Sequence, residues 1–309
     1  MMVAVAALLL WAFLWPREHE TSYEGRTLSE WLIVYTDNRP LRDQAANAVH
    51  HIGTNALPLL VKWMSYKMPK WRKTVAGAVA LNATSPARRR FLRSVAGLDA
   101  LRAEVAVAGF EILGPEAAPA VPALTNLLGD WDWRSRANFE RATIALKYMG
   151  NAGLTPLVCF VTNRNAPTEY RWAAASRIEA PITGWDTHAN WAVPVLIGCL
   201  DDRAVAPQIV RILGDLRLEP ALAVPALARC LEHDYTLISI KAAESLGRFG
   251  MSASVAVPDL VKALGSRDKF VRYAASNALE IIAPEVLKKA AHLPPHNTID
   301  GVPGARRHQ

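Results

Sequence analysis

The chain has 309 residues, of which 51% are apolar, and a formal net charge of +7. Its length and apolar content suffice for an extended core, as one long array or two globular domains. Three cysteines are too few for a disulfide framework, which excludes a fold that depends on oxidation. The positive charge is local, because the stretch from Gln44 to Leu98 has nine basic residues and no acidic one.

The N-terminal segment, residues 1–15, is apolar without interruption and ends at Pro16. As a helix it would be about 22 Å long, which is short of the roughly 30 Å hydrocarbon core of a bilayer. No basic residue precedes it and no Ala-x-Ala cleavage site follows it, which favours an uncleaved membrane anchor over a secretory signal. We therefore assign residues 1–16 to an apolar anchor and 17–26 to a polar linker. The side of the membrane that holds the rest of the chain stays open.

Thr27 and Glu30 have the spacing of a capping box, which predicts a helix from Leu28 to Thr36. Further along, glycine, or once asparagine, recurs at the end of one apolar segment after another. Helices can end at such residues because glycine and asparagine tolerate a left-handed conformation. The recurring positions, 29 to 36 residues apart, are Gly53, Asn82, Gly114, Gly150, Gly184, Gly214 and Gly250.

This period is typical of arrays of helix pairs that bury a core only by stacking. We predict eight pairs, whose first helices start near residues 28, 56, 86, 118, 154, 190, 221 and 254. The second helix of each pair has apolar or small residues 8, 5, 4 and 1 positions before its glycine, which places them on one face. First helices carry a Val-Pro dipeptide or a remnant of it, for example Val121-Pro122 and Val257-Pro258, where proline in a first turn loses no hydrogen bond. Cys199 and Cys230 follow such prolines at an apolar position, and we interpret both as core residues.

The stretch from Arg267 to Leu279 resembles the HEAT-repeat core, in which an aspartate of the hairpin turn precedes Val-Arg and an Ala-rich helix. Here these residues are Asp268, Val271-Arg272 and the helix that follows. The segment from Lys241 to Gly250 resembles the same core, and the anchor with Tyr23 to Leu32 resembles bacterial membrane-anchored HEAT-repeat proteins. The resemblance covers residues 27 to about 290. It implies an all-α, right-handed α-solenoid that binds other macromolecules, and it implies no catalytic residue and no cofactor.

The basic region has two open interpretations. It could contact an anionic surface such as phospholipid head groups, or it could be a solvated helix face whose aromatic residues are buried in the array. A nucleic acid is a rival partner, because some DNA glycosylases are built on HEAT-like repeats, although membrane tethering argues against it. The candidate contact residues are Lys62, Lys67, Lys70, Trp71, Arg72, Lys73, Arg88, Arg89, Arg90 and Arg93.

The fifth helix pair departs from the pattern, because Pro181 interrupts its second helix before Gly184. Irregular repeats are places where arrays bend or bind, which makes this helix pair a candidate partner surface. The alternative is a packing defect sealed by tryptophans. The candidate residues are Arg171, Trp172, Trp185, His188 and Trp191.

No catalytic motif or metal-ligand pattern is present in the sequence, and the one His-Glu pair, His19-Glu20, falls in the linker. We therefore expect no catalytic residue, no metal and no cofactor. Residues 27–291 form the predicted repeat array, and 292–309 a disordered tail. The predicted function is a non-enzymatic, membrane-anchored scaffold that docks a protein partner on its curved helical face. Residues such as Glu244, Arg272 and Asn277 would select that partner. A nucleic-acid-binding protein and an enzyme with an unrecognised site remain the alternatives.

Overall fold

A computed structural model describes residues 19–67, 69, 97–131, 135–178 and 187–286. In these residues the fold is all-α apart from one two-stranded hairpin. The chain divides into two compact units, residues 1–156 and 157–309. Each unit is built from short helices that pack in antiparallel pairs, which confirms the helical-repeat architecture predicted from the glycine period.

The hairpin opens the described chain, in the segment that the sequence assigns to a linker. Strands β1 (Ser22–Tyr23) and β2 (Arg26–Thr27) pair antiparallel, with Ser22 opposite Thr27 and Tyr23 opposite Arg26. Helix α2 (Leu28–Asp37) follows, and its capping box is confirmed: the Glu30 N–H donates to the Thr27 hydroxyl at 3.4 Å and the Thr27 N–H to the Glu30 carboxylate at 2.8 Å. The Trp31 indole N–H donates to the Tyr23 carbonyl at 2.9 Å. These contacts fix the hairpin against α2.

The N-terminal unit differs from the predicted succession of pairs at α7. This helix packs directly against α2, α3 and α4, so α4 and α7 form one pair rather than belonging to two different units. Gly109 permits the approach, because a Cβ at this position would lie 2.8 Å from the buried side chain of Leu60. The elements of this unit are η1 Arg39–Leu41, α3 Arg42–Ile52, η2 Gly53–Ala56, α4 Leu57–Met64, α7 Leu98–Leu113, η3 Gly114–Ala120, α8 Val121–Leu128 and α9 Arg136–Lys147.

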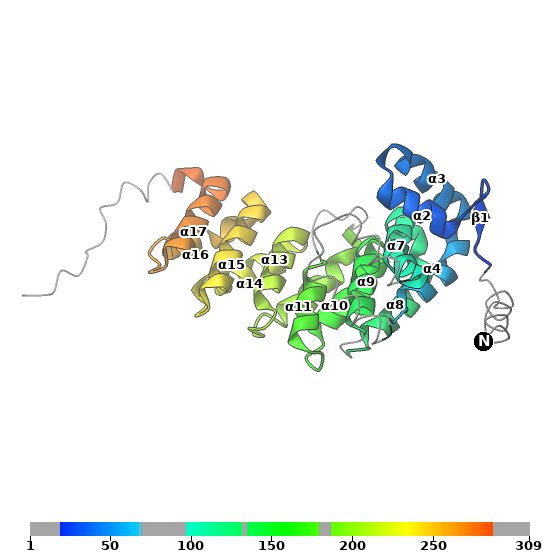
Figure 1. Cartoon of the computed structure of the whole chain (residues 1–309). Coiled ribbons are helices and arrows are strands. Elements are labelled where there is room, and N and C mark those ends of the chain that lie inside the picture. Colours follow the sequence, from blue (N-terminus) through cyan, green and yellow to red (C-terminus); the bar gives the residue numbers. More distant parts are fainter. Residues whose placement is uncertain (1–18, 68, 70–96, 132–134, 179–186, 287–309) are drawn as a thin grey trace, which may run out of the picture. The chain divides into compact units, whose positions relative to one another are not determined.

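Helix α10 (Asn151–Thr162) crosses the boundary between the units. In the C-terminal unit the second helices α13, α15 and α17 pack in succession, and the first helices lie along one side of them (Figure 1). The elements are α11 Thr168–Ala175, η4 Thr187–Trp191, α12 Ala192–Ile197, α13 Ala206–Leu216, α14 Pro220–Arg229, η5 Cys230–Glu232, α15 Thr236–Phe249, η6 Gly250–Ala256, α16 Val257–Ala263 and α17 Lys269–Ile282.

The core follows the predicted stripe of the second helices. In the five second helices counted back from Gly53, Gly114, Gly150, Gly214 and Gly250, every residue 8, 5, 4 and 1 positions before the glycine is buried. Because these offsets lie on one helical face, each helix turns its small and apolar residues toward its neighbours. The stripe is therefore what the helices bury when they stack.

Some of the recurring glycines end a helix, and one does not. Gly53, Gly114 and Gly250 end helices with φ between +53° and +59° and ψ between −129° and −143°, a combination restricted to glycine rather than the left-handed helical one expected from sequence. Gly214 was wrongly predicted as a helix end. Helix α13 continues to Leu216, and Arg217 takes the left-handed conformation with φ +52°.

The Val-Pro rule also holds only in part. Pro58, Pro122 and Pro258 lie in the first turn of α4, α8 and α16, as predicted. Pro156 and Pro225 instead lie inside α10 and α14, because these two helices begin about one turn earlier. At the corresponding place before α4, α8 and α16 the chain forms a separate 3-10 helix, namely η2, η3 and η6.

The anchor at 1–16, Asn82, Pro181, Gly184 and the tail at 292–309 lie outside the described residues. Among the helices of the described ranges, none is both long and apolar enough to cross a membrane.

Candidate functional site

The basic region is described only at its start. Lys62 is an exposed residue of α4, and Lys67 pairs with Asp130 at 2.5 Å, where both side chains are exposed. Trp63, between them, is a core residue with 4% exposure. The other candidate residues lie outside the described ranges: Lys70, Trp71, Arg72, Lys73, Arg88, Arg89, Arg90 and Arg93.

The candidate residues of the fifth helix pair do not share one environment. Trp172 and Trp191 are exposed, at 50% and 38%. Arg171 is 3% exposed; its Nε donates to the Val161 carbonyl at 2.8 Å and its guanidinium pairs with Asp202 at 2.7 Å. Arg171 is therefore an internal structural residue that links Val161 and Asp202. Trp185 lies outside the described residues, and of His188 only its place in η4 is described.

A groove of about 400 Å³ lies between α15 and α17. Small buried residues line its base, among them Gly247 of α15 and Ala278 of α17. A Cβ added to Gly247 would meet the Ala278 Cα at an ordinary contact distance of 3.4 Å, so the two helix backbones lie close together here. The small base makes room for a groove between the larger side chains on either side.

The wall of the groove on α17 carries large exposed apolar side chains. Phe270, Tyr273 and Ile281 are exposed at 58%, 68% and 60%, and they share one side of the helix. Ile240 of α15 also lines the groove. Exposed apolar side chains that gather around one groove are typical of a contact surface, whereas isolated ones are common on any protein.

The rim of the groove on α15 is polar and held in place by ion pairs. Glu244 accepts from Lys241 at 2.8 Å, and Arg248 donates to Asp215 of α13 at 2.7 Å. Asp215 also pairs with Arg211 at 2.7 Å. Asp215 is 15% exposed, so its two pairs hold Arg248 at the edge of the groove, whereas the more exposed Lys241–Glu244 pair adds little.

The motif that resembles the HEAT core fixes the start of α17. Asp268 accepts hydrogen bonds from the N–H groups of Phe270 at 2.7 Å and Val271 at 3.3 Å. Arg272 donates to the carbonyls of Ser266 at 2.8 Å and Arg267 at 3.0 Å. Of the three residues suggested as partner-selecting, Glu244 and Asn277 line the groove, whereas Arg272 holds the turn.

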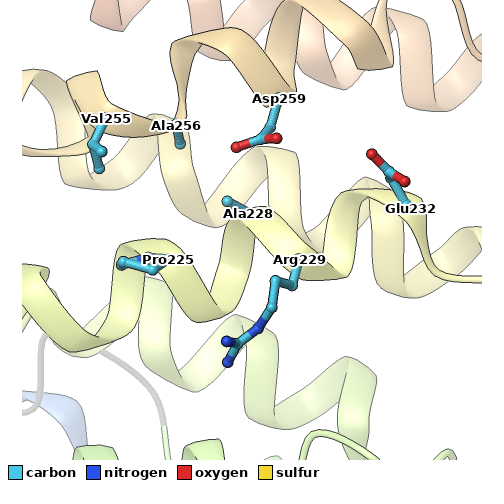
Figure 2. A pocket seen from close by; sticks show the side chains of 7 residues that line it. All are labelled: Pro225, Ala228, Arg229, Glu232, Val255, Ala256 and Asp259. Carbon is cyan, nitrogen blue, oxygen red and sulfur yellow. The ribbon is translucent and has the colours of Figure 1, made fainter.

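A second pocket, of about 350 Å³, lies between α14 and η6 with α16 (Figure 2). Pro225, Ala228, Val255 and Ala256 give it an apolar lining. Three charged residues, Asp259, Glu232 and Arg229, complete it. The Asp259 and Glu232 carboxylates lie on one side, and the Arg229 guanidinium is directed away from them.

No group of three or more metal-ligating side chains occurs in the described residues. The thiols of Cys199 and Cys230 are buried as core residues, at 8% and 7% exposure, and burial raises the pKa of both. A thiol with a raised pKa is a poor nucleophile at neutral pH.

The aromatic wall of the groove was not found from sequence. The stripe of α17 consists of Val271, Ala274, Ala275, Ala278, Leu279 and Ile282. Phe270, Tyr273 and Ile281 lie between these positions. Large apolar residues outside the buried stripe of a helix are the signal that could have located the groove.

Comparison with known proteins gives a match to one family model over part of the chain and a likeness to solved structures. A family model described as HEAT repeats matches residues 193–280. Among solved structures, an engineered protein is similar with 21% sequence identity and a TM-score of 0.42, over 82% of this chain and 77% of that chain. No curated protein matches the sequence.

Proposed function

Because residues 193–280 of this chain belong to the HEAT-repeat family, whose members generally act as scaffolds for protein interactions, we propose that this protein docks a protein partner in the groove between α15 and α17. The matched residues include both helices. Docking requires no catalytic group, and it needs only a preformed surface that gains free energy when a partner covers it.

The wall formed by Phe270, Tyr273 and Ile281 carries this proposal. Aromatic residues dominate binding energy at protein interfaces because they bury a large rigid surface at little entropic cost. A partner side chain that enters the groove would contact the aromatic wall and the small base together. Glu244, Arg248 and Asn277 would add directional hydrogen bonds at the edge, where they decide which partner fits.

The apolar anchor and the right-handed stacking expected from sequence belong to this proposal. The segment that follows the anchor is attached firmly to the repeats, because the buried Glu20 carboxylate pairs with Arg102 of α7 and accepts from the Ser29 N–H at 3.0 Å. An anchor at 1–16 would therefore hold the first helices close to the membrane. Separation of membrane and soluble fractions, with and without residues 1–18, tests this; equal distribution of the two forms contradicts it.

Photo-crosslinking in intact cells tests the docking surface. Replacing Tyr273 by the photoreactive analogue p-benzoylphenylalanine should give a discrete protein adduct, since this side chain is 68% exposed in the groove. The same analogue at Met251, which is 82% exposed but not part of the groove lining, is the matched control.

A Phe270→Ser change combined with the analogue at 273 should reduce the adduct several-fold, because it removes an aromatic anchor of the groove wall that is 58% exposed. Adducts of the same size and yield from positions 273 and 251 would show that the groove has no special role.

A further inference from the structure

The pocket between α14 and η6 has a different chemistry from the groove and lies on the first helices. We propose that it receives the side chain of a lysine or arginine from a partner protein, whose neighbouring apolar residues rest on the exposed apolar residues beside the pocket. The pocket is thus a second interaction surface, specific for a basic and aliphatic segment.

The lining of the pocket has two parts that suit the two parts of such a side chain. Pro225, Ala228, Val255 and Ala256 offer apolar surface, and the Asp259 and Glu232 carboxylates lie on one side (Figure 2). Lysine and arginine carry a cation on an aliphatic stem, which packs on apolar surface while the head reaches a carboxylate. Two carboxylates against one guanidinium that is directed away from them favour a cation over an anionic ligand, and a purely apolar ligand would leave the carboxylates unused.

The carboxylates are available to an incoming cation. The Asp259 carboxylate makes no hydrogen bond and no ion pair with another described residue, and its charge acts on Lys262 at longer range. Glu232 pairs with Lys262 at 2.6 Å, but the two side chains are 59% and 70% exposed, and exposed pairs of this kind contribute little. The hydrogen bond from Lys262 to Glu232, with a smaller effect of Asp259, raises the pKa of Lys262.

A bare metal ion fits less well than a cationic side chain. Calcium takes six to eight oxygen ligands, and magnesium requires a near-octahedral set. The pocket offers two carboxylates beside apolar carbon, and no group of three metal-ligating side chains is found in the described part of the chain. The apolar lining would also have no role around a hydrated ion.

The repeat register extends the apolar part of this surface. The position two residues before the valine of Val-Pro is exposed in three successive pairs of the C-terminal unit. It holds Trp191, Leu222 and Val255, at 38%, 50% and 67% exposure. The corresponding residues of the N-terminal unit are Asn55, Pro119 and Gly153. A partner that places a cation in the pocket thus meets apolar side chains at the same repeat position on neighbouring elements.

A library of displayed random 12-residue peptides, selected on the purified full chain, tests the proposal. Half of the selection is first depleted on the Asp259→Asn, Glu232→Gln double variant, whose shape is unchanged and whose two charges are lost. Peptides recovered from wild type but not from the double variant should be enriched in lysine or arginine next to aliphatic residues. A difference set without such enrichment, or no difference set, overturns the proposal.

Synthetic copies of the recovered peptides then give the affinity by fluorescence anisotropy. Asp259→Asn alone should weaken binding about fivefold, as expected for loss of one partly exposed ion pair. Glu169→Gln, which removes an exposed carboxylate of α11, should leave it unchanged. Equal weakening by both variants would indicate only general attraction to negative charge and would contradict the proposal. Tyr273→Ser should have no effect on this binding, which separates the pocket from the groove between α15 and α17.

Discussion

Gly214 of α13 lies directly against Ser245 of α15. A Cβ added to Gly214 would be 2.4 Å from the Ser245 Cβ, and the Ser245 hydroxyl donates to the Val210 carbonyl at 2.9 Å. Both residues are buried. Residue 214 is therefore glycine because two helices meet there, whereas Gly53 and Gly250 are glycine because the chain turns at them.

Replacing Gly214 by alanine should destabilise the protein although α13 continues through this position. Alanine favours a helix by about 1 kcal/mol over glycine, but an overpacked core contact costs about 1–3 kcal/mol, and at 2.4 Å we expect the clash to prevail by about 1–2 kcal/mol. Urea unfolding measures the difference. Gly198→Ala is the control, because its Cβ would meet only ordinary contacts of 3.5 Å or more. Equal stability of the two variants would contradict the close approach.

The part of the fold that repeats could be predicted from sequence, because each second helix buries the same offsets before its glycine. Two features could not. The direct pairing of α4 with α7 depends on which helices meet in space, and a period near 32 residues does not contain that information. The role of Gly214 as a close helix contact depends on Ser245, which is 31 residues away along the chain.

The candidate surfaces were less accessible to sequence reasoning. Charge and aromatic content indicated residues 62–93 and the fifth helix pair as candidate surfaces. In that pair, however, Arg171 is a buried structural residue. The groove depends on Phe270, Tyr273 and Ile281 facing α15, which requires the register of two helices. The second pocket combines η6 with α14, and neither segment carries a sequence motif for binding.

The cap of α17 gives a second prediction. Asp268→Ala removes the acceptor for the Phe270 and Val271 N–H groups and should cost about 1 kcal/mol. Asp268→Asn keeps an acceptor oxygen and should retain most of the stability. Because Phe270 stands at the freed end of α17, hydrogen exchange of its amide should also accelerate in the alanine variant. If the asparagine and alanine variants lose equal stability, the charge of Asp268 matters more than its hydrogen bonds.

The three thiols should differ in reactivity. Cys159 is exposed, whereas Cys199 and Cys230 are buried and burial raises the pKa of each. A thiol-specific disulfide reagent at neutral pH should modify one thiol quickly. The other two must wait for local opening, and an opening that costs about 3 kcal/mol slows them about 100-fold. Cys159→Ser should abolish the fast phase, and all three thiols should react together in denaturant. A fast phase that survives Cys159→Ser would disprove the assignment.

The pairing of Glu20 with Arg102 predicts that the N-terminal hairpin depends on one carboxylate. The Glu20 side chain is 5% exposed and that of Arg102 is 17% exposed. Breaking a fully buried pair costs about 3–5 kcal/mol, and because Arg102 keeps some contact with water we expect about 2 kcal/mol for Glu20→Gln. The loss should be local, so hydrogen exchange in residues 22–27 should accelerate while α15 and α17 stay protected. Glu24→Gln, an exposed change in the same hairpin, should leave exchange unaltered. Unchanged exchange in Glu20→Gln would mean that the Trp31 and Tyr23 contact holds the hairpin without the ion pair.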